Sequence, residues 1–318
     1  MTQDHAATET ADTDPLTRLR AGGKGAMAKA LARLERAPEA PATLDLLDTA
    51  HAAAQAHVIG LTGPPGVGKS TLLSALIRQL RGVGRSVGVI AVDPSSRHSG
   101  GALLGDRVRL LSDPADRGLF VRSMAARDRL GGLAELTMAS MVLMRAVYDV
   151  VLIETVGVGQ SETDVAGAAD TVVFCIQPGS GDSLQFMKAG IVEIPDIAVV
   201  TKSDVGPPAR RALSDLDGAL SLNDTAADAW TVRTLGVSAE SGEGLADLLA
   251  GLDAHHAWLA QAGRREALRR RQALDWLREA VKDRYGRRGL ARAGDLHLAQ
   301  DESPFARLAR IGASLETG

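Results

Sequence analysis

The residues most able to do chemistry lie in the segment 63–70, which has the phosphate-loop pattern G-x-x-x-x-G-K-S. Gly66 and Gly68 let the backbone approach a phosphate, Lys69 can reach the β- and γ-phosphates, and the Ser70 hydroxyl can bind Mg²⁺. We expect the whole stretch to contact the nucleotide: Gly63, Pro64, Pro65, Gly66, Val67, Gly68, Lys69, Ser70 and Thr71.

The surroundings of this loop support the same interpretation. The apolar run 57–62 predicts a buried strand, and residues 70–77 predict an amphipathic helix. At a strand-to-helix turn several backbone N–H groups point at one spot, where the helix dipole adds positive potential. The alternative is a glycine-rich turn without a ligand. The pattern favours a nucleoside triphosphate site.

Acidic residues at strand ends are candidate magnesium ligands. Glu154 ends the apolar run 150–153, Asp93 ends the run 87–92, and Asp106 closes a glycine-rich stretch. We expect Glu154 to bind Mg²⁺ and the backbone of Gly157 to reach the γ-phosphate. Asp93 and Asp106 could contact Mg²⁺ or position water. The alternative is a solvated strand end, or aspartates that cap a helix or turn.

A second motif predicts which base is bound. Thr201-Lys202-Ser203-Asp204 follows an apolar run and resembles the guanine-reading N-K-x-D element. The Asp204 carboxylate can accept hydrogen bonds from N1–H and the amine of guanine, whereas adenine offers neither donor there. Such a mismatch gives roughly 10⁴-fold discrimination in favour of GTP over ATP. Lys202 would lie along the base, and Ser238, Ala239 and Glu240 would form the loop that meets the guanine O6.

One position departs from this element. Thr201 stands where asparagine is usual, so we expect weaker support of the loop without loss of guanine preference.

Composition excludes several classes. The 318-residue chain has a formal net charge of −3, which indicates no nucleic-acid partner. Its one cysteine, Cys175, cannot form an internal disulfide and is expected in the core. The first fifteen residues carry no basic residue, and no apolar stretch approaches the ~20 residues that span a membrane. We therefore expect a cytoplasmic protein without a membrane partner.

Apolar runs that alternate with helical stretches predict an α/β fold. We expect a three-layer, doubly wound and mostly parallel sheet with helical extensions at both ends. The expected parts are a disordered tail (1–14), an N-terminal segment of two helices (15–55), a nucleotide domain (56–255) and a C-terminal helical arm (256–318).

The arm carries the features that predict assembly. Residues 264–285 predict a long helix with a stripe of Leu274, Leu277, Val281 and Tyr285, which must be buried against the same chain or a second one. We expect a homodimer held partly by this helix. The arginines of 264–271 are expected to form a solvated helix face. His255 and His256 are expected on a surface helix, without the spacing of metal ligands.

Four long segments together resemble one family of GTPases, that of MeaB, ArgK and their mitochondrial counterpart MMAA. Residues 149–162 read D-V-V-L-I-E-T-V-G-V-G-Q-S-E, and the other segments are 63–71, 91–96 and 177–185. The resemblance implies a Mg²⁺-dependent GTPase that forms homodimers and acts as a chaperone for an adenosylcobalamin-dependent acyl-CoA mutase. Within the same segment we expect Gln160 to take part in catalysis.

Some expectations stay open. Residues 123–129 depart from the family pattern, which leaves the identity of the mutase open. The D-x-H-x-x-G loop of cobalamin-binding domains is absent, so the cofactor is expected on the partner. The glycine-rich stretch 178–190 is expected to pass partner binding to the nucleotide. Alternatives are a GTP-dependent metal-insertion chaperone and a kinase of a periplasmic amino-acid transport protein.

Overall fold

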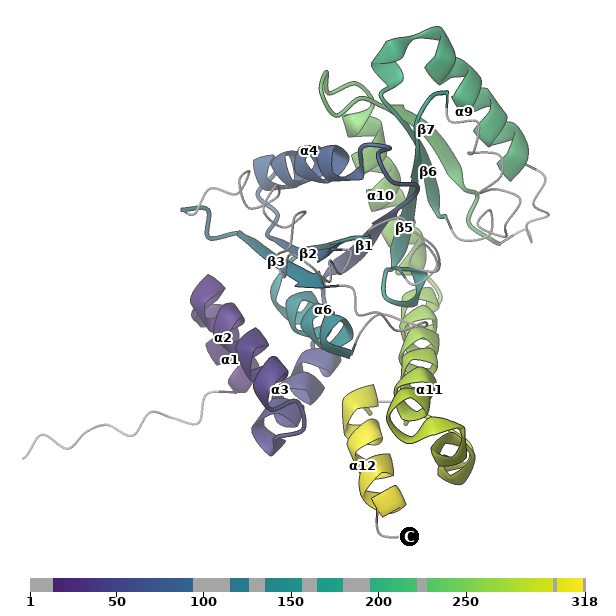
Figure 1. The fold of residues 1–318 in the computed structure, drawn as a ribbon. Helices are drawn as coiled ribbons and strands as arrows, with labels where there is room; N and C mark the ends of the chain where they lie inside the picture. The colour runs from purple at the N-terminus through teal and green to yellow at the C-terminus, as the bar shows by residue number, and fades with distance from the viewer. Residues whose placement is uncertain are drawn as a thin grey trace, which may run out of the picture.

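A seven-stranded parallel sheet forms the centre of the computed structural model, which describes residues 14–93, 115–125, 135–155, 165–179, 195–221, 228–299 and 302–316 (Figure 1). The strand order is β3-β2-β4-β1-β5-β6-β7, and each neighbouring pair is parallel. The strands are β1 (His57–Thr62), β2 (Val87–Asp93), β3 (Leu119–Ala125), β4 (Val150–Glu154), β5 (Thr171–Ile176), β6 (Ile197–Thr201) and β7 (Arg233–Val237).

Helices cover both faces of this sheet, so the doubly wound fold is confirmed. The helices α4 (Lys69–Gly82) and α10 (Leu245–Leu259) pack on one face. On the other face lie α6 (Glu135–Val147) and α9 (Pro207–Leu220). Because both faces are covered, β1, β4, β5 and β6 are buried at every residue, which explains their continuous apolar sequences.

The N- and C-terminal extensions pack together. Below α6 lie α1 (Pro15–Ala21), α2 (Gly23–Arg36) and α3 (Pro41–Ala52), next to α11 (Arg264–Ala293) and α12 (Pro304–Glu316) (Figure 1). Leu31, Leu47, Leu277, Val281 and Phe305 belong to one buried cluster. The two extensions therefore share a core although they are far apart in sequence.

Several sequence predictions are wrong in detail. Strand β3 was not predicted, because it lies at the edge of the sheet and carries polar Arg122 and Ser123. The segment 15–55 holds three helices, since α1 ends at Ala21, with Gly22 as its C-cap, and α2 begins at Gly23. Asp14 is not part of a tail: its carboxylate accepts a hydrogen bond from Thr17 N at 3.1 Å and caps α1.

The long helix of the arm is confirmed, and it runs beyond its predicted end. It continues to Ala293 with a break at Gly286, whose φ of 70° favours glycine. Among the described residues, no helix is both long enough and apolar enough to cross a membrane.

Candidate functional site

The phosphate loop joins the carboxyl end of β1 to the start of α4. Gly63, Gly66 and Gly68 have φ of 134°, 78° and 96°, which residues with a Cβ rarely adopt. Gly63 is also the point of closest approach to β5, because a Cβ there would lie 2.1 Å from the Cys175 carbonyl oxygen. Cys175 is buried, as expected, and burial raises the pKa of its thiol to about 12. The thiol is therefore a neutral packing group beneath the loop.

Lys69 lies across this loop. Its ammonium donates to the carbonyl oxygens of Gly63 at 2.7 Å and Pro64 at 2.9 Å. The side chain is buried as the first residue of α4. A buried ammonium held by neutral carbonyls places a positive charge where the backbone N–H groups of the loop converge.

Ser70 and Glu154 are brought together by strand pairing. Strand β4 pairs with β1 and places Glu154 beside Leu61, one residue before the end of β1. The Ser70 hydroxyl donates to Glu154 Oε1 at 2.6 Å, and Glu154 is buried. Hydroxyl and carboxylate oxygens are the hard ligands that Mg²⁺ prefers, so this pair fits the cation.

Thr201 connects the phosphate loop to the segment 201–204, which is predicted to read the base. Its hydroxyl Oγ1 lies 2.6 Å from the Val67 carbonyl oxygen and 2.9 Å from that of Ile176, and it is buried. The hydroxyl therefore contacts the phosphate loop directly.

The other residues predicted to read the base lie at the same edge of the sheet. Lys202 follows β6 with φ of 54°, and its ammonium donates to Gln177 Oε1 at 2.7 Å. Asp204 is exposed in the short helix η3 (Ser203–Val205). Since β5, β6 and β7 are parallel neighbours, their carboxyl ends bring these residues together.

The loop after β7 is fixed by its own hydrogen bonds. Ser238 is buried, its N–H donates to the Glu243 carbonyl at 2.9 Å, and its hydroxyl accepts from Ser241 N at 3.2 Å. Ala239 is half-buried and Glu240 is exposed beside it. This loop follows β7, the parallel neighbour of β6, so it lies at the edge of the sheet that carries Asp204.

Some predicted site residues are not placed. Asp106, Gly157 and Gln160 lie outside the described residues, as does most of the stretch 178–190. Asp93 ends β2, where it pairs with Ala125 of β3, two residues beyond Ala91, the partner of Glu154.

Sequence reasoning also missed Gln177 as the partner of Lys202. The sequence feature that could have indicated this contact is the position of Gln177 directly after β5, the strand next to β1.

A buried polar cluster occupies the opposite, amino edge of the sheet. Thr171 Oγ1 lies 2.6 Å from His57 Nε2 and 2.7 Å from His255 Nδ1, and His255 faces Asp196 at 3.4 Å. The prediction of a surface position was wrong for His255, which is buried. Burial lowers the pKa of His57 to about 3 and that of His255 to about 4. Both are neutral at pH 7, as suits structural hydrogen bonding.

The geometry defines a class before any comparison. A parallel sheet with a phosphate loop after its first strand, and a strand-end carboxylate on the loop's serine, is the architecture of P-loop nucleoside triphosphatases. Among the described residues no group of His, Cys, Asp and Glu could hold a metal ion on its own. The cation of this class is bound with the nucleotide.

Comparison with known proteins gives the family. The family model described as Methylmalonyl Co-A mutase-associated GTPase MeaB matches residues 27–293, so the chain belongs to the MeaB family and is a P-loop GTPase.

Relatives and a solved structure agree with this assignment. A Pyrococcus horikoshii protein named "Putative GTPase" is 41% identical over 80% of this chain and 81% of its own. GTPase ArgK of Escherichia coli is 35% identical over 85% and 83%. The mitochondrial methylmalonic aciduria type A homolog of Mus musculus is 38% identical over 71% and 55%. The crystal structure of a LAO/AO transport system kinase superposes with a TM-score of 0.65 and 28% identity, over 95% of this chain and 96% of that one.

Proposed function

We propose that this GTPase is a chaperone for an adenosylcobalamin-dependent acyl-CoA mutase. It would use GTP hydrolysis to gate cofactor loading of the mutase and to protect it. The observation that carries the proposal is the family match over residues 27–293, because that family is described by its association with methylmalonyl-CoA mutase. The mouse relative, named for methylmalonic aciduria, supports the same partner.

At the nucleotide, we assign roles from the contacts. Lys69 would exchange its bonds to the Gly63 and Pro64 carbonyls for the β- and γ-phosphate oxygens. Ser70 and Glu154 would hold Mg²⁺, directly or through water. When bound, the cation would neutralise charge on the transferring phosphoryl group. Asp93, Asp106 and Gln160 stay candidates for metal contact and for positioning the attacking water. Without an arginine supplied by a partner, turnover should be slow, about 10⁻⁴ to 10⁻² s⁻¹.

Guanine selection is assigned to Asp204. Its exposed carboxylate stands at the edge where Lys202 and the loop 238–240 converge, so it is free to accept from the base. Thr201 would transmit this contact to the phosphate loop through Val67.

The experiment has two arms. In the first, nucleotide binding is measured by titration: we expect GTP and GDP to bind far more tightly than ATP, and Lys69→Ala to lose nearly all turnover. In the second, the organism's own acyl-CoA mutases are tested for binding with GDP and with a non-hydrolysable GTP analogue. By linkage, a gating GTPase must bind its mutase with different affinities in the two states. Absence of binding to any mutase would reject the chaperone role.

A second candidate is a kinase of a transport protein, which the name of the matched crystal structure suggests. Transfer of the γ-phosphate to a protein, with release of no free phosphate, would favour it. Asp204 argues against it, because a carboxylate at the base edge leaves ATP mismatched.

A further inference from the structure

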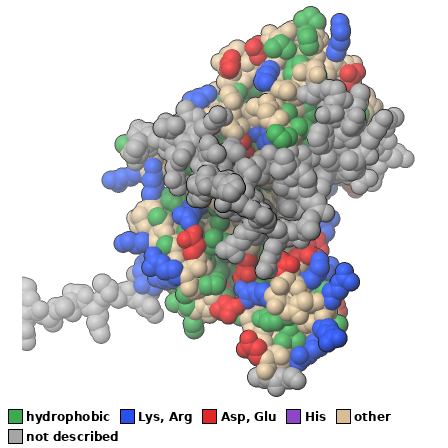
Figure 2. Space-filling view, in the orientation of Figure 1, with side chains coloured by type: hydrophobic (Ala, Val, Ile, Leu, Met, Phe, Trp, Pro, Cys, Tyr) green, Lys and Arg blue, Asp and Glu red, His purple; other side chains and the backbone are tan. Residues whose placement is uncertain are grey.

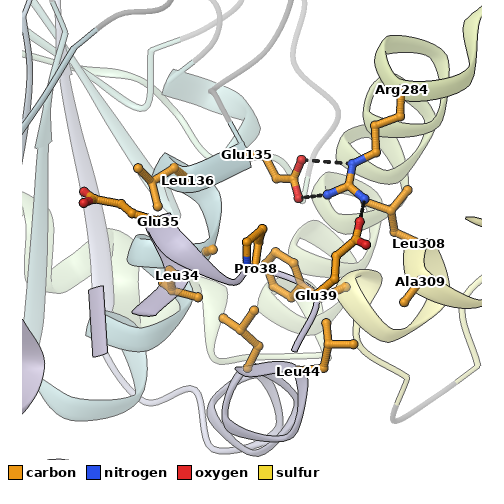
Figure 3. Close-up of a pocket in the computed structure, with 13 residues that line it drawn as sticks. Leu34, Glu35, Pro38, Glu39, Leu44, Glu135, Leu136, Arg284, Leu308 and Ala309 are labelled. Atoms are coloured by element: carbon orange, nitrogen blue, oxygen red, sulfur yellow. Dashed lines mark hydrogen bonds and ion pairs between the residues drawn. The ribbon is translucent and has the colours of Figure 1, made fainter. Parts of the chain in front are cut away.

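An open groove lies between the two helical extensions, away from the nucleotide site. Its volume is about 240 Å³, and it is formed by α2, α3, α6, α11 and α12 with the link between α2 and α3. Nine of its thirteen lining side chains are apolar, and Figure 3 shows Leu34, Leu44, Leu136, Leu308 and Ala309 around it. We call it the acidic groove, because the other four lining residues are Glu35, Glu39, Glu135 and Arg284.

Ion pairs close one side of the acidic groove. Arg284 pairs with both Glu135 and Glu39, with its Nε 3.2 Å from Glu135 Oε2 (Figure 3). Glu35 pairs with Arg122 of β3. Thus one arginine of the C-terminal arm joins the start of α6 to the link between α2 and α3.

The carboxylates are the outer members of these pairs. The side chains of Glu39, Glu35 and Glu135 are 62%, 39% and 38% exposed. Those of Arg284 and Arg122 are 23% and 30% exposed. Figure 3 shows the carboxylates of Glu39 and Glu135 together at Arg284, on one side of the groove, and that of Glu35 pointing away from them. Figure 2 shows apolar, acidic and basic side chains side by side in the lower half of the face where Figure 1 places these helices.

An apolar groove with exposed carboxylates at one side favours an occupant with an apolar side chain next to a basic one. Such a segment would bury the apolar group in the groove while its Lys or Arg pairs with Glu39, the most exposed of the three acids. A free anion is disfavoured because the lining carries three carboxylates and one guanidinium group, that of Arg284.

The groove also has a physical connection to the nucleotide site. Glu135, Leu136 and Ala139 belong to α6, which packs against β2 and β4. These two strands end at Asp93 and Glu154. A partner that moves the start of α6 would act on the strands that carry the candidate magnesium ligands.

We propose that the acidic groove is the surface on which the mutase partner docks a segment with adjacent apolar and basic side chains. This inference rests on the proposed function, from which it takes the identity of the partner. It adds the place of contact and the chemistry that the mutase must present.

The test uses the full chain and two groove variants of different kinds. Glu39→Lys reverses the charge of the outermost acid while Arg284 keeps its pair with Glu135. Ala309→Phe fills the half-buried edge of the groove without removing an ion pair. The matched control is Asp275→Lys on α11, because Asp275 is 63% exposed, pairs with Arg278 and does not line the groove.

Binding to the recombinant mutase is measured by calorimetry, with melting curves and basal GTPase rates to show that each variant is folded. We expect both groove variants to weaken binding at least ~10-fold and the control by less than ~2-fold. Added KCl should weaken binding of the native chain more than that of Glu39→Lys.

The outcomes separate the two hypotheses. Native-like binding by both groove variants would overturn the groove assignment and leave the chaperone role intact. Failure of the native chain to bind any mutase would remove both. If sedimentation shows that Ala309→Phe changes the oligomeric state of the GTPase alone, the occupant is a second copy and the proposal is wrong.

Discussion

The hydroxyl of Thr201 links the segment 201–204, predicted to read the base, to the phosphate loop. It contacts the carbonyl oxygens of Val67 and Ile176. Thr201→Val keeps the shape and removes both contacts. The hydroxyl has one hydrogen and donates to one of these carbonyls at a time. Leaving that buried carbonyl without its donor costs about 1 to 2 kcal/mol, so GTP should bind roughly 5- to 30-fold more weakly. The control is Thr234→Val on β7, whose hydroxyl contacts Asp217 outside the site. Unchanged GTP affinity of Thr201→Val in a titration would show that this contact is unimportant.

The assignment of Asp204 predicts which base the protein binds. Asp204→Asn replaces two acceptors with one acceptor and one donor, so the variant should lose GTP affinity and gain affinity for xanthosine nucleotides, whose C2 carbonyl can accept from the amide. Fluorescence titration with both nucleotides checks this. Equal affinity of the native chain for ATP and GTP would remove the assignment.

The positions of the loop 63–71, Glu154, Thr201 and Asp204 at strand ends could be predicted because motif spacing and strand ends are local properties of the sequence, while their roles stay predictions. The contact of Thr201 with Val67 could not, since it joins residues 134 positions apart through the sheet. The close approach of Gly63 to Cys175 has the same origin. The sequence pattern at Gly63 indicates glycine, but only strand pairing shows why.

At the scale of elements, one buried ion pair fastens α11 to the amino edge of the sheet. Arg269 donates two hydrogen bonds to Asp170, at 2.6 and 2.7 Å, and one to the Ala56 carbonyl. Both side chains are largely buried, so Arg269 is an exception to the predicted solvated face. Arg269→Met should destabilise the fold by about 3–5 kcal/mol, because it leaves a buried carboxylate unpaired. Exposed Arg270→Met is the control. Equal melting temperatures for the two variants would contradict this.

This pair also has a pH signature. Burial alone would raise the pKa of Asp170, but hydrogen bonding to Arg269 and the charge of its guanidinium lower it below the ordinary value of 3.8. A lowered carboxyl pKa in the folded state gives stability that is present above this value and is lost as the pH falls through the folded pKa. The difference in unfolding free energy between native chain and Arg269→Met should therefore be constant near neutrality and shrink in acid.

The elements that could be predicted are those buried on both faces. Strand β1 has the predicted bounds, and β4 matches the apolar run 150–153 with Glu154 at its end, because both runs are continuous. Strand β3 was missed since an edge strand needs fewer apolar residues. The third N-terminal helix was missed because a single glycine, Gly22, ends α1 without interrupting the helical spacing of apolar residues.

At the scale of the whole molecule, the homodimer stays a prediction, but the apolar stripe on α11 supports it less than the sequence suggested. Leu277 and Val281 are buried within the single chain, against the shared core of the two extensions, so these two residues need no second copy to cover them, while Leu274 and Tyr285 are half-buried. Removing residues 264–318 would expose that core and is expected to lower the melting temperature as well as affect assembly. Light scattering of the full chain at micromolar concentration is the better test. A monomeric mass would contradict the dimer.

The central claim is that this GTPase is a chaperone for a mutase. The rate of phosphate release in the presence of the mutase tests this claim most directly. The rate is measured for the native chain alone and with each of the organism's adenosylcobalamin-dependent acyl-CoA mutases, with Lys69→Ala as the inactive control. We expect one mutase to raise the rate at least ~10-fold, which needs only ~1.4 kcal/mol of transition-state stabilisation. An unchanged rate with every mutase, at concentrations that saturate any binding, would contradict the account.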